Sequence, residues 1–263
     1  MLIDTHCHLN YLHDGDLDAI EKTLQEAHTA GVQHCICIGV DIAALPKVLE
    51  IGMRFPQVKV SVGVHPCDVA ALPVEEALSA LQSYVTHPEV VAIGECGLDY
   101  YREESLDKTV QKSYFSGQIQ LAKAANKPLV VHTRQARADT IDVIRVAGNG
   151  DVRGVMHCFT ETKEMAAQAL DLGFYISFSG IITFKNAEPL RDVVRYVPMD
   201  RLLVETDSPY LAPVPFRGKE NCPAHVVEVA KQVAVLKNLS YDAVCQQTTS
   251  NARQLFGWPL ACG

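Results

Sequence analysis

Short runs of β-branched and other apolar residues alternate with longer amphipathic segments along the whole chain. The runs predict strands over residues 2–8, 34–40, 59–65, 90–95, 128–132, 152–157, 173–178 and 202–207. Such short, continuously apolar runs are typical of buried parallel strands. Apolar residues at helical spacing predict helices over 16–30, 74–84, 106–125, 162–172, 186–196, 222–237 and 240–256.

Repeated strand–helix alternation is the pattern of a (β/α)8 TIM barrel, and 263 residues suit one such domain. No linker, low-complexity tract or block of charge divides the chain, so residues 1–263 are predicted to form a single domain. The sequence contains neither the G-x-G-x-x-G loop of dinucleotide-binding folds nor a Walker lysine loop.

Composition narrows the class of protein. Apolar residues make up 48% of the chain, enough for a large core, and the net charge of −8 argues against an extended basic groove for nucleic acid. No apolar stretch approaches the ~20 residues that span a bilayer. Nine scattered cysteines without a C-x-x-C pair indicate buried thiols in a reducing compartment. Because Asp4 and His6 interrupt the first apolar run, we expect no secretory leader and a cytoplasmic protein. No feature of the sequence indicates an obligate protein partner.

The predicted strands end on residues that bind metals. His6 and His8 are two positions apart, so they share one face of the first strand and Cys7 points away. The later strand ends carry His65, Glu95, His132, His157, Glu205 and Asp207. Singly, each is more often a packing histidine or a strand-ending acid. Together at the mouth of one barrel they would bury charge at heavy cost without a cation.

Two divalent ions would balance this cluster. His6, His8 and Asp207 suit one ion, His132 and His157 suit the second, and Glu95 has two oxygens with which to bridge both. Imidazole ligands favour Zn²⁺, whereas carboxylates and a phosphate substrate suit Mg²⁺ or Mn²⁺ equally.

Seven segments resemble, in order and across essentially the whole chain, the TatD family of metal-dependent hydrolases within the amidohydrolase-like barrels. They are residues 4–9, 63–66, 94–100, 128–134, 157–160, 173–180 and 205–213. The resemblance implies metal ligands at His6, His8, Glu95, His132, His157 and Asp207. It also implies a metal-dependent deoxyribonuclease, often a 3′→5′ exonuclease on single strands.

Our mechanistic hypothesis assigns a role to each remaining strand-end residue. A metal-bound hydroxide attacks phosphorus in line, and Asp207 orients or deprotonates the water. Glu95, as the bridge, is the second candidate catalytic residue. His65 is not needed as a ligand and either binds the phosphate or protonates the leaving oxygen. Glu205 accepts a hydrogen bond from a ligand histidine.

Substrate contacts are expected from the predicted loops that follow the strands. Five cations lie there, namely Arg134, Arg137, Lys185, Arg217 and Lys219, and we assign phosphate binding to Arg134 alone. Five aromatic residues lie there as well, namely Tyr100, Tyr101, Phe159, Phe184 and Tyr210. Each either stacks on a terminal base or packs its own loop.

Three alternatives remain open from the sequence. The same scaffold could hydrolyse the C–N bond of a cyclic amide, which only substrate screening would distinguish. A metal-binding or interaction module without turnover would not require the complete ligand set. An endonuclease for damaged duplex DNA would require the basic groove that the composition lacks.

Overall fold

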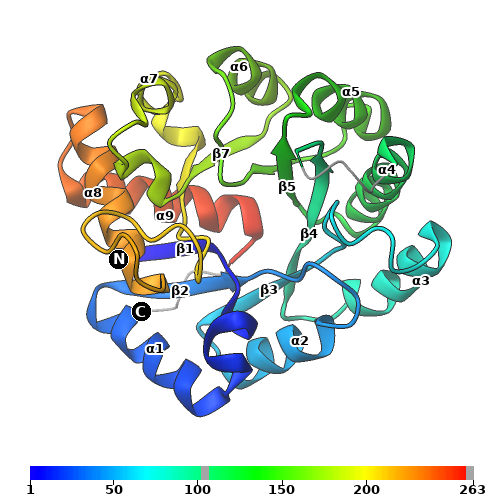
Figure 1. The fold of residues 1–263 in the computed structure, drawn as a ribbon, viewed down its shortest axis with the longest axis horizontal. Coiled ribbons are helices and arrows are strands. Elements are labelled where there is room, and N and C mark those ends of the chain that lie inside the picture. The colour runs from blue at the N-terminus through cyan, green and yellow to red at the C-terminus, as the bar shows by residue number, and fades with distance from the viewer. Residues whose placement is uncertain (102–106, 259–263) are drawn as a thin grey trace.

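Eight parallel strands follow one another in chain order around a central axis (Figure 1), which confirms the predicted barrel. A computed structural model describes residues 1–101 and 107–258. The strands are β1 (Leu2–Cys7), β2 (Val32–Cys37), β3 (Val58–Val62), β4 (Val90–Asp99), β5 (Leu129–Arg134), β6 (Gly154–Met156), β7 (Tyr175–Phe178) and β8 (Leu202–Val204). Burial of most of their residues explains the apolar runs in the sequence.

Helices surround the strands (Figure 1). They are α1 (Leu17–Thr29), α2 (Leu45–Arg54), α3 (Val74–Val85), α4 (Lys108–Ala125), α5 (Arg137–Gly148), α6 (Lys163–Asp171), α7 (Glu188–Tyr196), α8 (Val226–Lys237) and α9 (Tyr241–Phe256). Short 3₁₀ segments occupy Leu9–Gly15, Gly180–Thr183, Met199–Arg201 and Pro223–His225. None of the helices in the described part of the chain combines the length and apolarity needed to cross a membrane. The predicted start of the α4 helix at residue 106 lies outside the described residues.

The sequence prediction missed two helices. In α2, Leu45, Val48 and Ile51 form a buried stripe at helical spacing, and Asp41 Oδ1 accepts the Ala44 N–H at 2.9 Å just before the helix. In α5 the buried stripe is short and lies among charged residues, so its periodicity is weak.

The strand ends also differ from the prediction. β3 stops at Val62 and β8 at Val204, so His65 and Asp207 lie in the loops that follow. β4 instead continues to Asp99, because Gly97 and Asp99 still pair with β5. The side chains at the barrel mouth therefore come partly from strands, as at His6, Glu95 and His132, and partly from the loops that follow them.

The barrel closes between β1 and β8 through a narrow seam. One isolated bridge joins Cys7 to Ser208, and the Asp207 N–H donates to the His6 carbonyl at 2.9 Å. The buried Asp4 carboxylate adds a clasp, since Oδ1 accepts the Thr206 N–H at 2.9 Å and Oδ2 accepts the Thr206 hydroxyl at 2.5 Å. Side chains thus supply much of the closure that a regular ladder would otherwise provide.

Helix α9 covers the end of the barrel where the strands begin. Its residues Ala252, Leu255 and Phe256 join a buried cluster with Ile3 and Leu203 of the strands. In Figure 1 this helix, coloured red, passes across the barrel close to β1. With that end filled by apolar side chains, the end where the strands finish is left for chemistry.

The seam makes a specific demand on Thr206. Replacing Thr206 with Val should lower the free energy of unfolding by roughly 1–3 kcal/mol, because the buried Asp4 carboxyl group loses a hydrogen-bond donor. Urea denaturation measures the change. Thr29→Val is the matched control, since that hydroxyl bonds within exposed helix α1. Equal stability of the two variants would contradict a structural role for the seam.

Candidate metal centre

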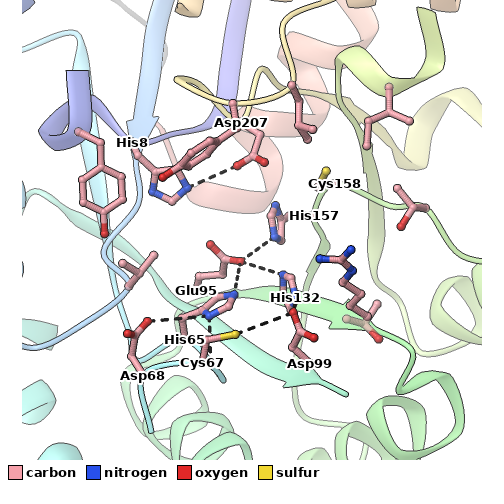
Figure 2. Close-up of a pocket in the computed structure, with 18 residues that line it drawn as sticks. His8, His65, Cys67, Asp68, Glu95, Asp99, His132, His157, Cys158 and Asp207 are labelled. Atoms are coloured by element: carbon pink, nitrogen blue, oxygen red, sulfur yellow. Dashed lines mark hydrogen bonds and ion pairs between the residues drawn. The ribbon is translucent and has the colours of Figure 1, made fainter. Parts of the chain in front are cut away.

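A cavity of about 630 Å³ opens where the strands end, and Figure 2 shows the side chains that line it. Its lining includes His8, His65, Glu95, His132, His157, Asp207 and Arg134. His6 is fully buried. The structure therefore brings together the strand-end residues that the sequence singled out.

Two glycines allow Glu95 to reach the centre of this group. A Cβ on Gly63 would lie 2.4 Å from the Gly94 carbonyl carbon, so no other residue permits this approach of the two strands. Gly94 itself has φ of +135°, which side-chain-bearing residues rarely adopt. Beyond it, the Glu95 N–H donates to the Gly39 carbonyl at 2.9 Å.

The Glu95 carboxylate contacts four imidazoles. Oε1 lies 2.8 Å from His157 Nε2, 3.1 Å from His132 Nδ1 and 3.3 Å from His65 Nε2. Oε2 lies 3.4 Å from His6 Nε2. One carboxylate thus faces histidines that lie in or just after four different strands, as Figure 2 shows for three of them.

A second set of donor atoms surrounds His6. Its Nε2 lies 3.3 Å from His8 Nε2 and 3.5 Å from Asp207 Oδ1, and His8 Nε2 lies 3.4 Å from the same oxygen. Ligands about 2.0–2.1 Å from one tetrahedral ion would be separated by roughly 3.3–3.4 Å. These separations, and the close approach of two imidazole nitrogens, fit a metal ion. Among the described residues, two further groups of donors converge, namely His65, Glu95 and His132, and His6, His157 and Glu205.

The outer nitrogens of three histidines determine which nitrogen faces inward with a lone pair. His157 Nδ1 lies 3.4 Å from Glu205 Oε1, His132 Nε2 lies 3.1 Å from Asp99 Oδ2, and His8 Nδ1 lies 3.4 Å from the Ile38 carbonyl. Because each outer nitrogen faces an acceptor, it carries the proton, and the inner nitrogen is free to bind a cation. Glu205 additionally accepts the Cys158 N–H at 2.6 Å.

His65 has the opposite arrangement. Its Nδ1 accepts the Cys67 N–H at 3.1 Å, so in the neutral ring the proton is on Nε2, which faces Glu95. A protonated nitrogen donates a hydrogen bond and does not ligate a metal. This contact separates His65 from the other histidines of the cavity.

Charge around the centre shifts several pKa values. Burial alone would raise the pKa of Glu95, but His157 and His65 outweigh it and hold the pKa well below the ordinary value. Burial alone would lower the pKa of His157, His132 and His8, but neighbouring carboxylates outweigh it and raise all three. The carboxylates therefore attract positive charge, for which protons and metal ions compete.

The predicted substrate contacts divide into two groups. Arg134 lines the cavity and its guanidinium stacks 3.6 Å from the ring centre of Tyr101, and Tyr210 lines the cavity with 55% of its surface exposed. The remaining cations, Arg137, Lys185, Arg217 and Lys219, are not among the residues lining the cavity. Tyr100, Phe159 and Phe184 are likewise absent from its lining.

Other partners account for part of this second group. Arg137 pairs with Glu161, and Arg217 stacks 3.8 Å from the ring centre of Phe184. The Tyr100 hydroxyl donates to Asp139 at 2.7 Å, and Phe159 is buried. These residues serve loop packing.

Sequence reasoning missed several residues that line the cavity, among them Asp99 and Tyr11. Asp99 was overlooked because the glycines at 94 and 97 seemed to end its strand, although the acid directly precedes two tyrosines. Tyr11 stacks beside His8 with ring centres 5.4 Å apart, in the 3₁₀ segment after β1. No periodic pattern marks Tyr11, since that segment is irregular.

The chain resembles known proteins along nearly its whole length. The family model described as TatD related DNase matches residues 3–257. The uncharacterized metal-dependent hydrolase YcfH of Escherichia coli K12 is 46% identical over 257 residues, which cover 97% of this chain and 95% of that protein. The uncharacterized metal-dependent hydrolase YabD of Bacillus subtilis is 40% identical, with coverage of 97% and 99%. The crystal structure of YJJV, a TatD homologue from Escherichia coli, has a TM-score of 0.88 at 28% identity and covers 98% of both chains.

Glu95 is the residue whose loss should affect metal binding most. Glu95→Ala should bind divalent ions more weakly by at least about 10–100-fold, since the carboxylate that contacts both donor sets disappears. Metal titration followed by elemental analysis measures this. Glu89→Ala, which removes a carboxylate paired with Lys59 away from the cavity, is the control. Retention of two ions at wild-type affinity in Glu95→Ala would contradict the assignment.

The stability that a bound metal ion adds should rise with pH. With EDTA, the raised pKa values of His8, His132 and His157 contribute stability below the unfolded value of 6.5 that is lost as pH rises through the folded values, whereas the lowered pKa values of His6 and His65 contribute in the opposite direction. With Zn²⁺ or Mn²⁺, stability should rise over the same range, because ligation requires neutral imidazole. Thermal denaturation from about pH 6 to 8 tests this; parallel profiles with EDTA and with metal would refute it.

Proposed function

This chain belongs to the family described as TatD related DNase and is a metal-dependent hydrolase, and we propose that it hydrolyses phosphodiester bonds of DNA. The observation that carries the proposal is the pair of donor sets that meet at Glu95. Such paired sites are used for displacement at phosphorus, where attacking and leaving oxygens both need charge stabilisation.

The chain offers ligands for two divalent ions. His6, His8 and Asp207 would hold one, His132 and His157 would hold the other, and Glu95 would bridge them. When bound, such ions lower the pKa of water and stabilise negative charge on phosphoryl oxygens. Zn²⁺, Mg²⁺ and Mn²⁺ remain the candidates, because both imidazole and carboxylate donors are present.

Two residues of the cavity would then act on substrate and water. Asp207 is ionised, because His8 and His6 outweigh burial and lower its pKa, so its carboxylate is available to orient a water and take its proton. His65 presents an N–H at Nε2, which suits a hydrogen bond to a phosphoryl oxygen or to the leaving oxygen. Glu205 would hold His157 in the tautomer that ligates.

The mouth of the cavity suits the end of a single strand better than a long duplex. Arg134 is exposed beside the centre and would contact a phosphate. Tyr11 and Tyr210, with 39% and 55% of their surfaces exposed, lie near His8 and offer faces on which a terminal base could stack. The net charge of −8 agrees with gripping a few phosphates rather than many. We therefore propose a 3′→5′ exonuclease on single-stranded DNA.

Product mapping on end-labelled single-stranded DNA tests the proposal. The metal-loaded enzyme should release mononucleotides stepwise from the 3′ end and lose this activity in EDTA. Dihydroorotate-like cyclic amides are assayed in parallel. Cleavage of the amide without cleavage of DNA would favour a C–N hydrolase, and metal binding without any hydrolysis would favour a binding protein.

His65 gives a sharper test of the same mechanism. Removing one hydrogen-bond donor to a charged transition state costs about 10²–10³ in kcat, so His65→Ala should show this loss while still binding both ions. His87→Ala is a matched control, because His87 Nδ1 accepts the Glu89 N–H at 3.2 Å in the same local arrangement outside the cavity. If His65→Ala lost an ion instead, His65 would be a ligand and the assignment would fail.

A further inference from the structure

Helix α4 buries two glutamines on the face that packs against the barrel. Gln111 and Gln118 have no exposed surface, and they are seven positions, or about two turns, apart. A buried amide is costly unless its carbonyl and its amino group both find partners. The partners of both amides lie at the mouth of the barrel, beside residues of the metal centre.

The Gln118 amide makes two hydrogen bonds to the backbone of Val64, next to His65. Its Oε1 accepts the Val64 N–H at 2.9 Å, and its Nε2 donates to the Val64 carbonyl at 3.0 Å. Val64 lies beyond the end of β3, and on the opposite side the His65 N–H donates to the Val40 carbonyl at 2.7 Å. The Gln118 amide therefore replaces the neighbouring strand where the sheet ladder has ended.

The Gln111 amide makes the same pair of hydrogen bonds to the backbone of Asp99. Its Oε1 accepts the Asp99 N–H at 2.9 Å, and its Nε2 donates to the Asp99 carbonyl at 3.0 Å. The Asp99 carboxylate lies 3.1 Å from His132 Nε2 through Oδ2 and accepts the Tyr101 N–H at 2.9 Å through Oδ1. In Figure 2, Asp99 lies beside His132, close to His65.

We propose that Gln111 and Gln118 are positioning residues, through which α4 sets His132 and His65 against Glu95. The two pairs of amide hydrogen bonds act on different parts of the centre. Gln111 acts through Asp99 on His132, a metal ligand, whereas Gln118 acts on His65, which donates a hydrogen bond. The proposal rests on the proposed metal-dependent hydrolase centre, and it predicts two separable defects.

The alternative is that both amides only satisfy backbone groups at a helix–sheet contact. In that case their removal would destabilise the fold without a selective effect on metal binding or turnover. Gln120, on the same helix, is exposed and donates to the Ala147 carbonyl at 2.9 Å. It provides a matched control for losing an amide-to-backbone hydrogen bond away from the centre.

The experiment compares Gln111→Met, Gln118→Met and Gln120→Met in the full chain. In Gln111→Met we expect the second Co²⁺ or Zn²⁺ to bind about 10–100-fold more weakly while the first binds as in wild type. In Gln118→Met we expect both ions to bind normally and kcat for bis(p-nitrophenyl) phosphate to fall by up to about 100-fold. Gln120→Met should match wild type in both measurements.

The proposal is overturned if the folded Met variants keep the second-ion affinity and kcat within about threefold of wild type, or if Gln120→Met shows the same defects. Should either Met variant not fold, Gln111→Asn and Gln118→Asn replace them, because they keep a neutral amide and withdraw it by one methylene from the backbone groups. If wild type binds two ions but hydrolyses no phosphodiester, the proposed function fails, while metal titration still decides whether Gln111 positions His132. The NMR chemical shift of the His65 ring in the Zn²⁺-loaded protein then decides whether Gln118 positions His65. An unchanged shift in Gln118→Met would overturn that role.

Discussion

The contact on which the site depends is that of one buried carboxylate with four imidazoles. Glu95 reaches His6, His65, His132 and His157, which come from separate parts of the barrel. Each imidazole would be held against its neighbours at a cost unless positive charge lay between them. Gly63 packs closely against Gly94, directly before Glu95, so the approach of the backbone at this point depends on the absence of a side chain.

Hydrogen bonds at the outer nitrogens divide similar histidines into different roles. Asp99 is hydrogen-bonded to the outer nitrogen of His132, and Glu205 lies 3.4 Å from the outer nitrogen of His157, so each ring keeps an inner lone pair for a cation. The Cys67 N–H reverses this for His65, which presents a proton instead. Position at the barrel mouth alone therefore does not make a histidine a ligand; the partner of its second nitrogen decides.

The sequence predicted the barrel and the grouping of the strand-end residues for physical reasons. Parallel strands buried on both faces are continuously apolar, so a polar residue at the end of such a run is conspicuous, as at His132 and His157. Asp99 lacked this contrast because it follows two glycines in one strand. The hydrogen bonds of Gln111 and Gln118 to the backbone could not be predicted from the sequence. Each depends on which backbone groups lose their partners where neighbouring strands separate, and the spacing of apolar residues does not report this.

The two halves of the centre are consequently held by different sets of hydrogen bonds. His6, His8 and Asp207 meet across the seam between β1 and β8, where the Asp4 clasp on Thr206 sets the alignment. The half around His65 and His132 is attached to α4 through the hydrogen bonds of the Gln118 and Gln111 amides. Because the two arrangements share no residue, a disturbance of one half passes to the other through the residues that contact both, namely Glu95 and His157, whose ring stacks on that of His6 with centres 3.9 Å apart. Glu95 therefore carries mechanical coupling between the halves as well as charge.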